Sequence, residues 1–545
     1  MSGRSRAALL LVAGVPLLVL LVFFAVPVAG MVSKGFWSGG SFDPAGVGAA
    51  LGSPHVLGVL WFTVWSAAAA TVVTVLLGLP TTYALHRLAV PGRGLLRALV
   101  MVPFVLPTVV VGVAFDQVFG QGGPLGWLHL GGTAVAIVVA MVFFNVGVVV
   151  RTVGAFWESM DPRREQAAAA LGASPRQVWW TVTLPALLPS VAAAASVVFL
   201  FCATAFGVVL TMGGLRYSNV ETEVYLLTTQ ELDLRGAAAL SLLQLVIIVL
   251  LLAGIGRVRR HQAPVERGAA PVRRPGTRDL PSLVVAGCTV LFLLLPLVSL
   301  LQASLTSGGH WTLANFRRLQ GNGAEHTLLA TGLGALRTSL ELALAAAAMA
   351  VVLGLLVSYV VSRRPSGPLA RRLVGLFDGV FMLPLGVSAV TLGFGFLITL
   401  NRPPLDLRTS PVLIPIAQAL VALPLVVRTV APVWRSVDQR QREAAASLGA
   451  GPGRVFATVD LPTAVRPVLA ATGFAFAVSL GEFGATSFLA RTDHVTLPVV
   501  IYQLLGQPGP GDFGMAMAAS VVLAAATAAV MFLVERLRVG SMGAF

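Results

Sequence analysis

Few side chains in this sequence could perform nucleophilic, metal or nucleotide chemistry. The 545 residues include a single lysine, Lys34, and two cysteines, Cys202 and Cys288. A phosphate-binding P-loop needs a lysine directly before serine or threonine, whereas Lys34 is followed by glycine. Both cysteines lie inside apolar blocks, which supports neither a disulfide framework nor a cysteine-based metal site. We therefore predict that the chain is not an enzyme and carries no catalytic or metal centre.

Glu482 is the ionisable residue with the clearest functional placement, because it lies at the end of an apolar block. A carboxylate at membrane depth is usually functional, and it would suit a cationic solute. The alternative is a structural hydrogen bond to a neighbouring helix, and the same two interpretations apply to Glu341 in an earlier block. The other candidates for a solute pathway are an amide and four aromatic residues, namely Asn145, Phe206, Tyr225, Phe483 and Tyr502.

Each of these five residues also has a structural interpretation. Asn145 suits a contact between helices, and the two tyrosines suit anchors at the membrane interface. The two phenylalanines suit packing positions that line a gate.

Two polar loops repeat the same pattern. The first reads DPRREQAAAALGASPRQVWWTVTLP over 161–185, and the second reads DQRQREAAASLGAGPGRVFATVDLP over 438–462. In the first loop we predict a helix capped by Asp161 with Pro162 at its first position, followed by an alanine run. The glycines Gly172 and Gly449 would end these helices in a left-handed conformation. The pattern therefore predicts a helix, a break and a second short helix, twice.

The rest of the chain repeats with the loops at an offset of 277 residues. Pro107 corresponds to Pro384, and the register continues without a gap as far as Tyr225 and Tyr502. Such a long register indicates an internal duplication. We predict a first repeat over 1–256 and a second over 281–545.

The elements that position these loops must be membrane helices. Hydrophobic residues make up 57% of the chain and charged residues 11%, whereas soluble domains are about a quarter charged. Apolar blocks long enough to span a bilayer number twelve, six in each repeat. They lie near 8–30, 57–85, 97–118, 134–153, 187–212, 237–256, 282–303, 336–361, 373–400, 411–431, 465–490 and 513–535. The predicted fold is an all-α integral membrane protein with two parallel six-helix repeats.

The net charge of +15 comes mainly from arginines between the blocks. This is the positive-inside pattern of a multi-pass membrane protein and not a nucleic-acid surface. It places both termini, both polar loops and a basic linker at 257–280 in the cytosol, with 213–236 and 491–512 facing outward.

The two polar loops resemble the EAA signature of type I ABC importer permeases, the binding-protein-dependent family. In the second loop Glu443, Ala444, Ala445, Gly449, Leu461 and Pro462 match it. In the first loop Ala167, Ala168, Gly172, Leu184 and Pro185 match, while Gln166 replaces the glutamate and Glu165 stands beside it as a substitute. The resemblance implies that both loops are coupling helices that dock on ATPase subunits. The alternative for a single loop is an amphipathic interfacial helix, which two copies at one spacing disfavour.

The same resemblance implies the partners. These are two copies of an ABC ATPase, which would hold ATP and Mg²⁺, and an extracytoplasmic solute-binding protein. This chain would bind no cofactor and would lie in the plasma membrane. Fused double permeases of this length are similar to thiamine and ferric-iron transporter permeases. Stretches such as 142–145, 206–214 and 479–484 are closer to the thiamine permeases, so we expect thiamine or a related cation, with ferric iron as the alternative. A gradient-driven twelve-helix secondary transporter would leave the matched loops unexplained.

Overall fold

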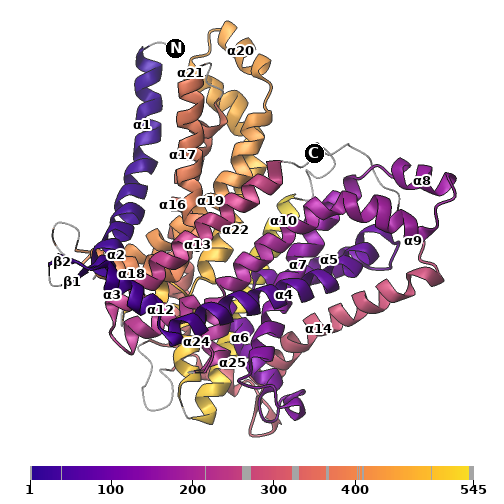
Figure 1. The fold of residues 1–545 in the computed structure, drawn as a ribbon, viewed down its shortest axis with the longest axis vertical. Helices are drawn as coiled ribbons and strands as arrows, with labels where there is room; N and C mark the ends of the chain where they lie inside the picture. The colour runs from indigo at the N-terminus through magenta and orange to yellow at the C-terminus, as the bar shows by residue number, and fades with distance from the viewer. Residues whose placement is uncertain are drawn as a thin grey trace. The chain divides into compact units, whose positions relative to one another are not determined.

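The computed structural model describes residues 3–38, 40–214, 216–260, 272–321, 330–363, 367–401, 403, 406–407, 410–491, 494–507 and 509–538. Within these residues the chain is almost entirely helical (Figure 1). Two small hairpins are the exceptions, formed by β1 (Trp37–Ser38) with β2 (Ser41–Phe42) and by β3 (Thr306–Ser307) with β4 (His310–Trp311). The predicted all-α class is therefore confirmed.

The helices follow one another in the same way in both repeats. In the first repeat they are α1 (Gly3–Leu20), the π-helix η1 (Leu21–Ala25), α2 (Val26–Phe36), α3 (Pro44–Leu51), α4 (Pro54–Arg87), α5 (Arg93–Val105), α6 (Thr108–Phe119), η2 (Gly126–Leu128), α7 (Ala134–Ser159), α8 (Arg163–Ala170), α9 (Pro175–Val178), η3 (Trp179–Thr183), α10 (Leu184–Ala203), α11 (Phe206–Gly213), α12 (Val220–Thr229) and α13 (Leu234–Arg260). In the second they are η4 (Thr277–Asp279), α14 (Leu280–Ser304), α15 (Ala314–Arg318), α16 (Gly332–Ser362), α17 (Pro368–Gly386), α18 (Ala389–Thr399), α19 (Leu413–Ser436), α20 (Gln439–Ser447), α21 (Pro452–Val455), η6 (Phe456–Asp460), α22 (Leu461–Leu480), α23 (Thr486–Leu489), α24 (Leu497–Leu505) and α25 (Pro510–Arg538).

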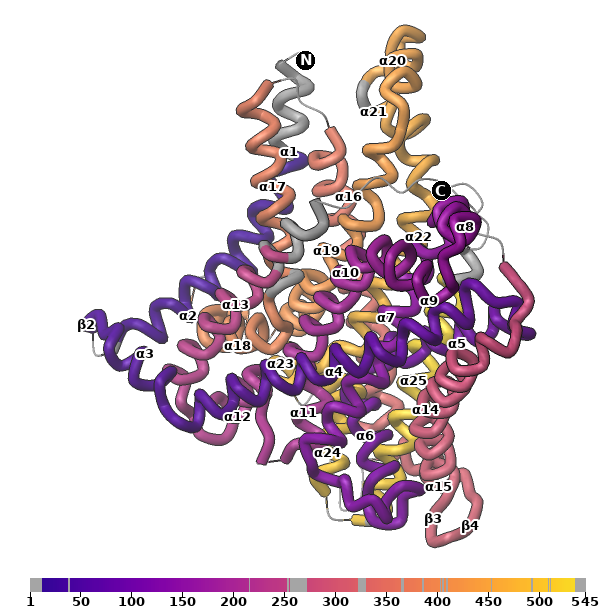
Figure 2. The backbone as a smooth tube through the Cα atoms, turned by 45° about the vertical axis from the view of Figure 1, so that its right-hand side comes forward, coloured from indigo at the N-terminus to yellow at the C-terminus, as the bar shows by residue number. Residues whose placement is uncertain are grey.

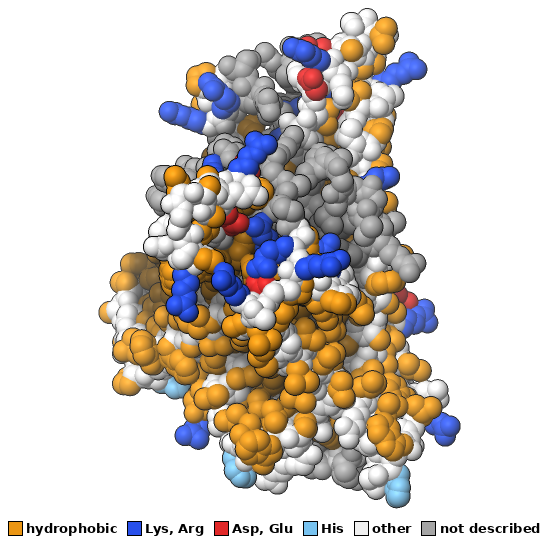
Figure 3. Space-filling model, turned by 90° about the vertical axis from the view of Figure 1, so that its right-hand side faces the viewer, with side chains coloured by type: hydrophobic (Ala, Val, Ile, Leu, Met, Phe, Trp, Pro, Cys, Tyr) orange, Lys and Arg blue, Asp and Glu red, His pale blue; other side chains and the backbone are white. Residues whose placement is uncertain are grey.

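The described residues contain ten helices that are long and apolar enough to cross a membrane, or twelve spans if each of two bent pairs counts as one. Large apolar side chains remain on their outer faces, such as Trp61 at 69% and Leu95 at 76% exposure. Figure 3 shows a broad hydrophobic area on one face, with most of the basic side chains gathered along one side of it. Such a surface is expected where lipid covers the protein. The chain is a multi-pass membrane protein.

The third predicted block of each repeat is not a straight helix. At 97–118 the helices α5 and α6 meet at 103°, and at 373–400 the helices α17 and α18 meet at 90°. Pro107 begins the second arm of the first bend, since it lacks an N–H for the helical ladder. The second bend comes one turn later than the repeat offset predicts, where Ser388 caps α18 by accepting from the Val390 amide at 3.0 Å.

The predicted blocks 187–212 and 465–490 are also interrupted. In the first, α10 ends at Ala203 and α11 begins at Phe206. In the second, α22 ends at Leu480 and α23 begins at Thr486. Hydropathy reports apolar length and not direction, so it does not reveal these breaks.

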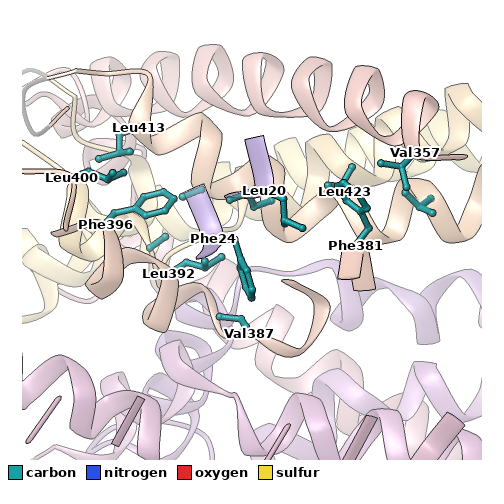
Figure 4. Packing of buried hydrophobic residues seen from close by; sticks show 14 of the residues in the cluster. Leu20, Phe24, Val357, Phe381, Val387, Leu392, Phe396, Leu400, Leu413 and Leu423 are labelled. Atoms are coloured by element: carbon teal, nitrogen blue, oxygen red, sulfur yellow. The ribbon is translucent and has the colours of Figure 1, made fainter. Parts of the chain in front are cut away.

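The chain forms two compact units that do not coincide with the two sequence repeats. Unit 1 contains 1–50, 224–245 and 316–545, and unit 2 contains 51–223 and 246–315. In unit 1 the amino-terminal helices pack among helices of the second repeat, where Leu20 and Phe24 are buried beside Phe381 and Leu392 (Figure 4). The α2 and α18 backbones approach closely, since a Cβ on Gly395 would stand 2.9 Å from Pro27.

Unit 2 shows the reciprocal arrangement. The helix α14, which begins the second repeat, packs against α4, α5 and α6 of the first. Phe292 of α14 lies 6.2 Å from Phe115 and 6.1 Å from Phe143, ring centroid to centroid. The first helix of each repeat therefore packs against helices of the other repeat.

The predicted linker is partly helical. Residues 257–260 continue α13, and 272–280 lead through η4 into α14, while 261–271 lie outside the described residues. Within unit 2, Arg273 pairs with the end of α4 through a backbone bridge to Leu88.

Candidate coupling loops and buried polar residues

Both loops form the predicted helix, break and second helix. The helices α8 and α20 end in the same hydrogen-bonded turn, in which Gly172 and Gly449 have φ of +86° and +83°. The Gly172 amide donates to the Ala169 carbonyl at 3.0 Å and the Ala173 amide to the Ala168 carbonyl at 3.1 Å. The corresponding amides of Gly449 and residue 450 bond at the same distances. This is the Schellman ending, which favours glycine at the left-handed position.

The helix starts differ slightly from the prediction. Asp438 caps α20 by accepting from the Arg440 amide at 3.0 Å. Asp161 accepts from the Arg163 amide at 2.9 Å in the same way, but α8 begins after Pro162 and not with it. At the start of α9, Ser174 and Gln177 form a reciprocal capping box.

Each loop displays a leucine at the same place, and the first loop also exposes Trp180. Leu171 is 89% exposed and Leu448 is 87% exposed, and each directly precedes the left-handed glycine. In Figure 2, α20 and α21 extend beyond the end of α19 in unit 1, and α8 lies near the end of α7 in unit 2. A single exposed leucine is common on protein surfaces, so the informative observation is that the two loops expose a leucine at the same position of the repeat.

The signature residues around these leucines are mostly exposed. Gln166, Ala167, Glu443 and Ala444 lie on the open faces of α8 and α20, while Ala168 and Ala445 are half-buried. Leu184–Pro185 and Leu461–Pro462 begin the long helices α10 and α22. Both loops therefore pass directly from an exposed short helix into a membrane span.

Glu165 does not face the same way as Gln166. Its carboxylate accepts from the Arg87 guanidinium at 2.7 Å and from the Thr183 hydroxyl at 2.9 Å. The side chain is 21% exposed. Glu165 therefore ties α8 to the ends of α4 and η3, whereas the Gln166 side chain is exposed.

The second loop has the same tie with its charges exchanged. Arg442 stands at the position of Glu165, and Asp460 at the position of Thr183. The Asp460 carboxylate, 2% exposed, accepts from Arg442 at 2.8 Å and from Arg363 at 3.2 Å. In each repeat one carboxylate thus joins the polar loop to two membrane helices. In the first repeat this carboxylate is Glu165 of the loop helix α8. In the second repeat it is Asp460, directly before the long helix α22.

Glu482 is buried at 7% exposure in the break between α22 and α23. Its carboxylate accepts from the Ala485 amide at 2.8 Å and from the Thr486 amide at 3.2 Å, so it caps the start of α23. The structural interpretation of Glu482 is therefore supported by two hydrogen bonds, both to amides that follow it in the same break.

Three pathway candidates belong to two aromatic pairs in unit 1. The Phe483 ring lies 5.6 Å from that of Tyr502, and the Tyr225 ring lies 5.4 Å from that of Phe488. Phe483 is buried and both tyrosines are half-buried. These two pairs, on α12, α23, α24 and the break that contains Glu482, are called the aromatic group below.

The other two candidates belong to unit 2. The Asn145 amide donates to the Met141 carbonyl at 2.9 Å and to Cys202 Sγ at 3.2 Å, which joins α7 to α10. The Asn145 amide nitrogen thus makes a contact between helices, while its buried Oδ1 has no hydrogen-bond partner among the described residues. Phe206 is buried at the start of α11.

Sequence reasoning missed the buried acids of α12. It treated Glu221 and Glu223 as outward loop charges, yet each is 2% exposed, and Glu223 lies 2.7 Å from His55 Nε2. Glu341 is 63% exposed and pairs with Arg337 at 2.7 Å, so it has no buried role.

Comparison with known proteins accounts for the duplication. The model of the family described as binding-protein-dependent transport system inner membrane component matches twice, over 75–261 and 350–539. The thiamine transport system permease protein of Brucella abortus is 29% identical over 526 residues, which cover 93% of this chain and 92% of that protein. The Escherichia coli protein of that description is 27% identical over 82% of this chain and 83% of its own length. A molybdenum transport system permease protein of Mycobacterium bovis is 34% identical over 43% of this chain and 89% of its own length.

Proposed function

We propose, from the premise that the chain belongs to the family of binding-protein-dependent transport system inner membrane components, that it imports thiamine or a related cationic solute. It is a permease of an ABC importer with both permease domains in one chain. Because the thiamine permeases match over nearly the whole length, they favour thiamine over ferric iron. The match to a molybdenum permease shows that the family alone does not fix the solute.

The observation that carries the coupling role is the repeated display of Leu171 and Leu448. We propose that each leucine enters an apolar groove on one ATPase subunit, and that Glu443 adds a polar contact in the second loop. ATP and Mg²⁺ would be held by the two ATPase subunits, and an extracytoplasmic binding protein would deliver the solute. The tie through Glu165 or Asp460 would then transmit ATPase movement to the long helices.

Support for a cationic solute comes from buried acids. Glu221, Glu223 and Glu482 are each at most 7% exposed, the first two in α12 and the third in the break before α23. The aromatic rings of Tyr225, Phe483 and Tyr502 offer faces that attract a cationic ring. We propose that the solute passes this aromatic group.

The test is ATP-dependent uptake into proteoliposomes that contain the complete transporter and its binding protein. We expect uptake of thiamine but not of Fe³⁺. Leu448→Asp should lower ATPase affinity roughly tenfold or more, as loss of an interface anchor does, and Leu171→Asp should act in the same direction. Arg440→Gln is the matched control, because Arg440 lies on the same exposed loop as Leu448. Leu95→Asp is not a suitable control, because its side chain would face lipid.

Uptake of neither ion would refute the proposed solute. Normal ATPase binding by both leucine variants would refute the coupling role, whichever solute is carried.

A further inference from the structure

The long helix that follows each polar loop contains a π-helix near its start. These are η3 between α9 and α10, and η6 between α21 and α22. The Leu184 amide donates to the Trp179 carbonyl, five residues back. The Leu461 amide donates to the Phe456 carbonyl in the same way, whereas a regular α-helix bonds four residues back. Since π-helices are rare and frequently lie at functional sites, two at equivalent positions of a duplicated chain indicate a shared role.

A proline follows each π-helix at the same place. Pro185 and Pro462 are the second residues of α10 and α22, and neither has an N–H to donate to the carbonyl four residues back. The third π-helix of the described residues, η1, has the same feature, since Pro27 is the second residue of α2. The wider turn is therefore a local response of the helix to the proline that follows it.

Proline alone does not force this turn. The two hairpins share the sequence SGG and the same register, which aligns Ser38 with Ser307 and therefore Pro27 with Pro296, at an offset of 269. Pro296 lies inside α14, which continues as an α-helix from Leu280 to Ser304. Equivalent prolines thus occur with both hydrogen-bond patterns, so the surroundings of the turn decide which pattern forms.

The first residue of each π-helix is held by a buried indole. The Trp179 ring lies 5.7 Å from the ring of Trp157 on α7. The Phe456 ring lies 5.7 Å from the ring of Trp434 on α19. Both indoles are 1% exposed. These stacked rings fix the beginning of each π-helix to a membrane helix of the same unit.

The last residue of each π-helix is tied to the short helix of its polar loop. The Thr183 hydroxyl donates to the Glu165 carboxylate of α8 at 2.9 Å. The Asp460 carboxylate accepts from the Arg442 guanidinium of α20 at 2.8 Å. Each π-helix is therefore fixed at its first residue to a membrane helix and at its last residue to the loop helix.

The middle of each π-helix faces outward. Thr181 and Thr458 occupy equivalent positions and are both exposed, as are Trp180 and Ala457 beside them. A change of hydrogen-bond pattern at these residues does not require their side chains to leave a packed core. Local rearrangement is least costly where few buried contacts are lost.

We infer that η3 and η6 are joints that change between the π and α patterns when the ATPase subunits move the loops. A partner that moves α8 or α20 pulls on the last residue of the π-helix through the tie, while the stacked rings hold the first residue. The turn between these two points must then take up the displacement, and α10 or α22 follows it. This inference rests on the proposed function, because it requires that the loops dock on ATPase subunits.

The test removes one residue from each joint. A turn that closes over five residues and loses one closes over four, so the helix faces on either side keep their directions. The variants are therefore deletions of Thr181 and of Thr458, which are exposed and equivalent. The matched control is deletion of Ala25, an exposed residue of η1, because that π-helix belongs to no polar loop.

The variants are compared in proteoliposomes that hold the complete transporter with its binding protein. We expect both joint deletions to bind the ATPase as the wild type does, but to lower the solute taken up per ATP hydrolysed roughly tenfold. Deletion of Ala25 should leave this ratio unchanged. A wild-type ratio in both joint deletions would overturn the inference, and so would an equal fall on deletion of Ala25.

A second measurement on the wild-type complex applies even if the deletion variants fail to fold. Hydrogen exchange, followed by mass spectrometry, compares the nucleotide-free complex with the complex that holds a non-hydrolysable ATP analogue. We expect amide exchange at 179–184 and 456–461 to differ between the two states, and exchange at 21–26 to stay the same. Equal exchange in both states at both joints would overturn the inference, as would a change of the same size at 21–26.

Failure of the proposed function gives a different result. A wild-type chain that binds no ATPase would refute the proposed coupling role, and the joints with it. A wild-type transporter that binds and hydrolyses ATP but takes up no thiamine would refute only the proposed solute, because hydrogen exchange at the joints does not depend on which solute is carried.

Discussion

Glu482 illustrates how one buried carboxylate can meet a local structural need. Its two oxygens satisfy the backbone amides of Ala485 and Thr486, which are the first donors of α23. In the first repeat this position is Ala205, and the chain there enters the longer helix α11 almost directly. The carboxylate thus has a local reason to exist in the second repeat only.

We predict that Glu482→Gln destabilises the protein by about 1–3 kcal/mol, because the amide offers one acceptor oxygen where two amides need one each. Thermal unfolding of the purified protein, measured beside thiamine uptake, separates the roles. Glu341→Gln is the control, since the exposed pair with Arg337 contributes little. Lost uptake at unchanged stability would instead assign Glu482 to the solute pathway.

At the scale of elements, the coupling loops are tied to the membrane helices by buried ion pairs. Asp460 joins α20, through Arg442, to the end of α16, through Arg363. Glu165 joins α8 to α4 and η3. Since each carboxylate meets partners from two other elements, its removal should loosen the loop as a whole.

We predict that Asp460→Asn costs roughly 3–5 kcal/mol, because Arg442 would remain at 11% exposure without its counter-charge. Asp378→Asn should cost about 1 kcal/mol or less, since the Arg435–Asp378 pair is more exposed. Chemical denaturation of the detergent-solubilised protein gives both values. Equal losses of unfolding free energy in the two variants would show that the buried Asp460 pair contributes no more stability than the exposed Asp378 pair.

The left-handed glycines set the shape of the same loops. No atom lies within 4 Å of a Cβ added at Gly449 or Gly172, so a side chain there is opposed by the backbone conformation and not by crowding. We predict that Gly449→Val distorts the loop at a cost of about 1–2 kcal/mol and uncouples ATP hydrolysis from uptake, with normal membrane insertion. Gly172→Val should act in the same direction.

The matched control for both is Gly451→Ala, because Gly451 lies in the same loop with open space around it and no positive φ. Coupled transport in both valine variants would remove the assignment of these loops as coupling helices.

The loops could be predicted from sequence because aspartate caps, alanine runs and glycine endings act within a few residues. The ties could not, since Arg87 and Glu165 are 78 positions apart and Glu165 has no counterpart of its own sign in the second repeat. The bends at 105–108 and 386–389 escaped for a different reason. Hydropathy remains high through a bend, and Ser388, one turn beyond the repeat register, provides the second break.

At the scale of the whole molecule, the two sequence repeats and the two compact units divide the chain at different residues. The repeats follow the sequence, but α1–α2 pack with the second repeat in unit 1 and α14 packs with the first in unit 2. Neither sequence repeat contains all the helices that bury its own apolar faces. We therefore expect each half to be unstable when it is produced without the other. In a fused chain, the helices that pack with the other repeat are always present in equal amounts.

The orientation of the whole chain is the last prediction. The basic loops place the linker and both coupling loops inside and 213–236 outside. In a background with Cys202→Ser and Cys288→Ala, single cysteines at the exposed residues Glu231, Arg274 and Leu448 would report each side. A serine at 202 retains an acceptor for the Asn145 amide.

An impermeant maleimide should label Glu231→Cys in intact cells, and it should label Arg274→Cys and Leu448→Cys only after permeabilisation. Prior blocking with a permeant maleimide should abolish all three signals, which controls for background labelling. Labelling of Arg274→Cys in intact cells would reverse the orientation. The coupling loops would then lie on the side without ATP, so the same result would contradict ATPase docking.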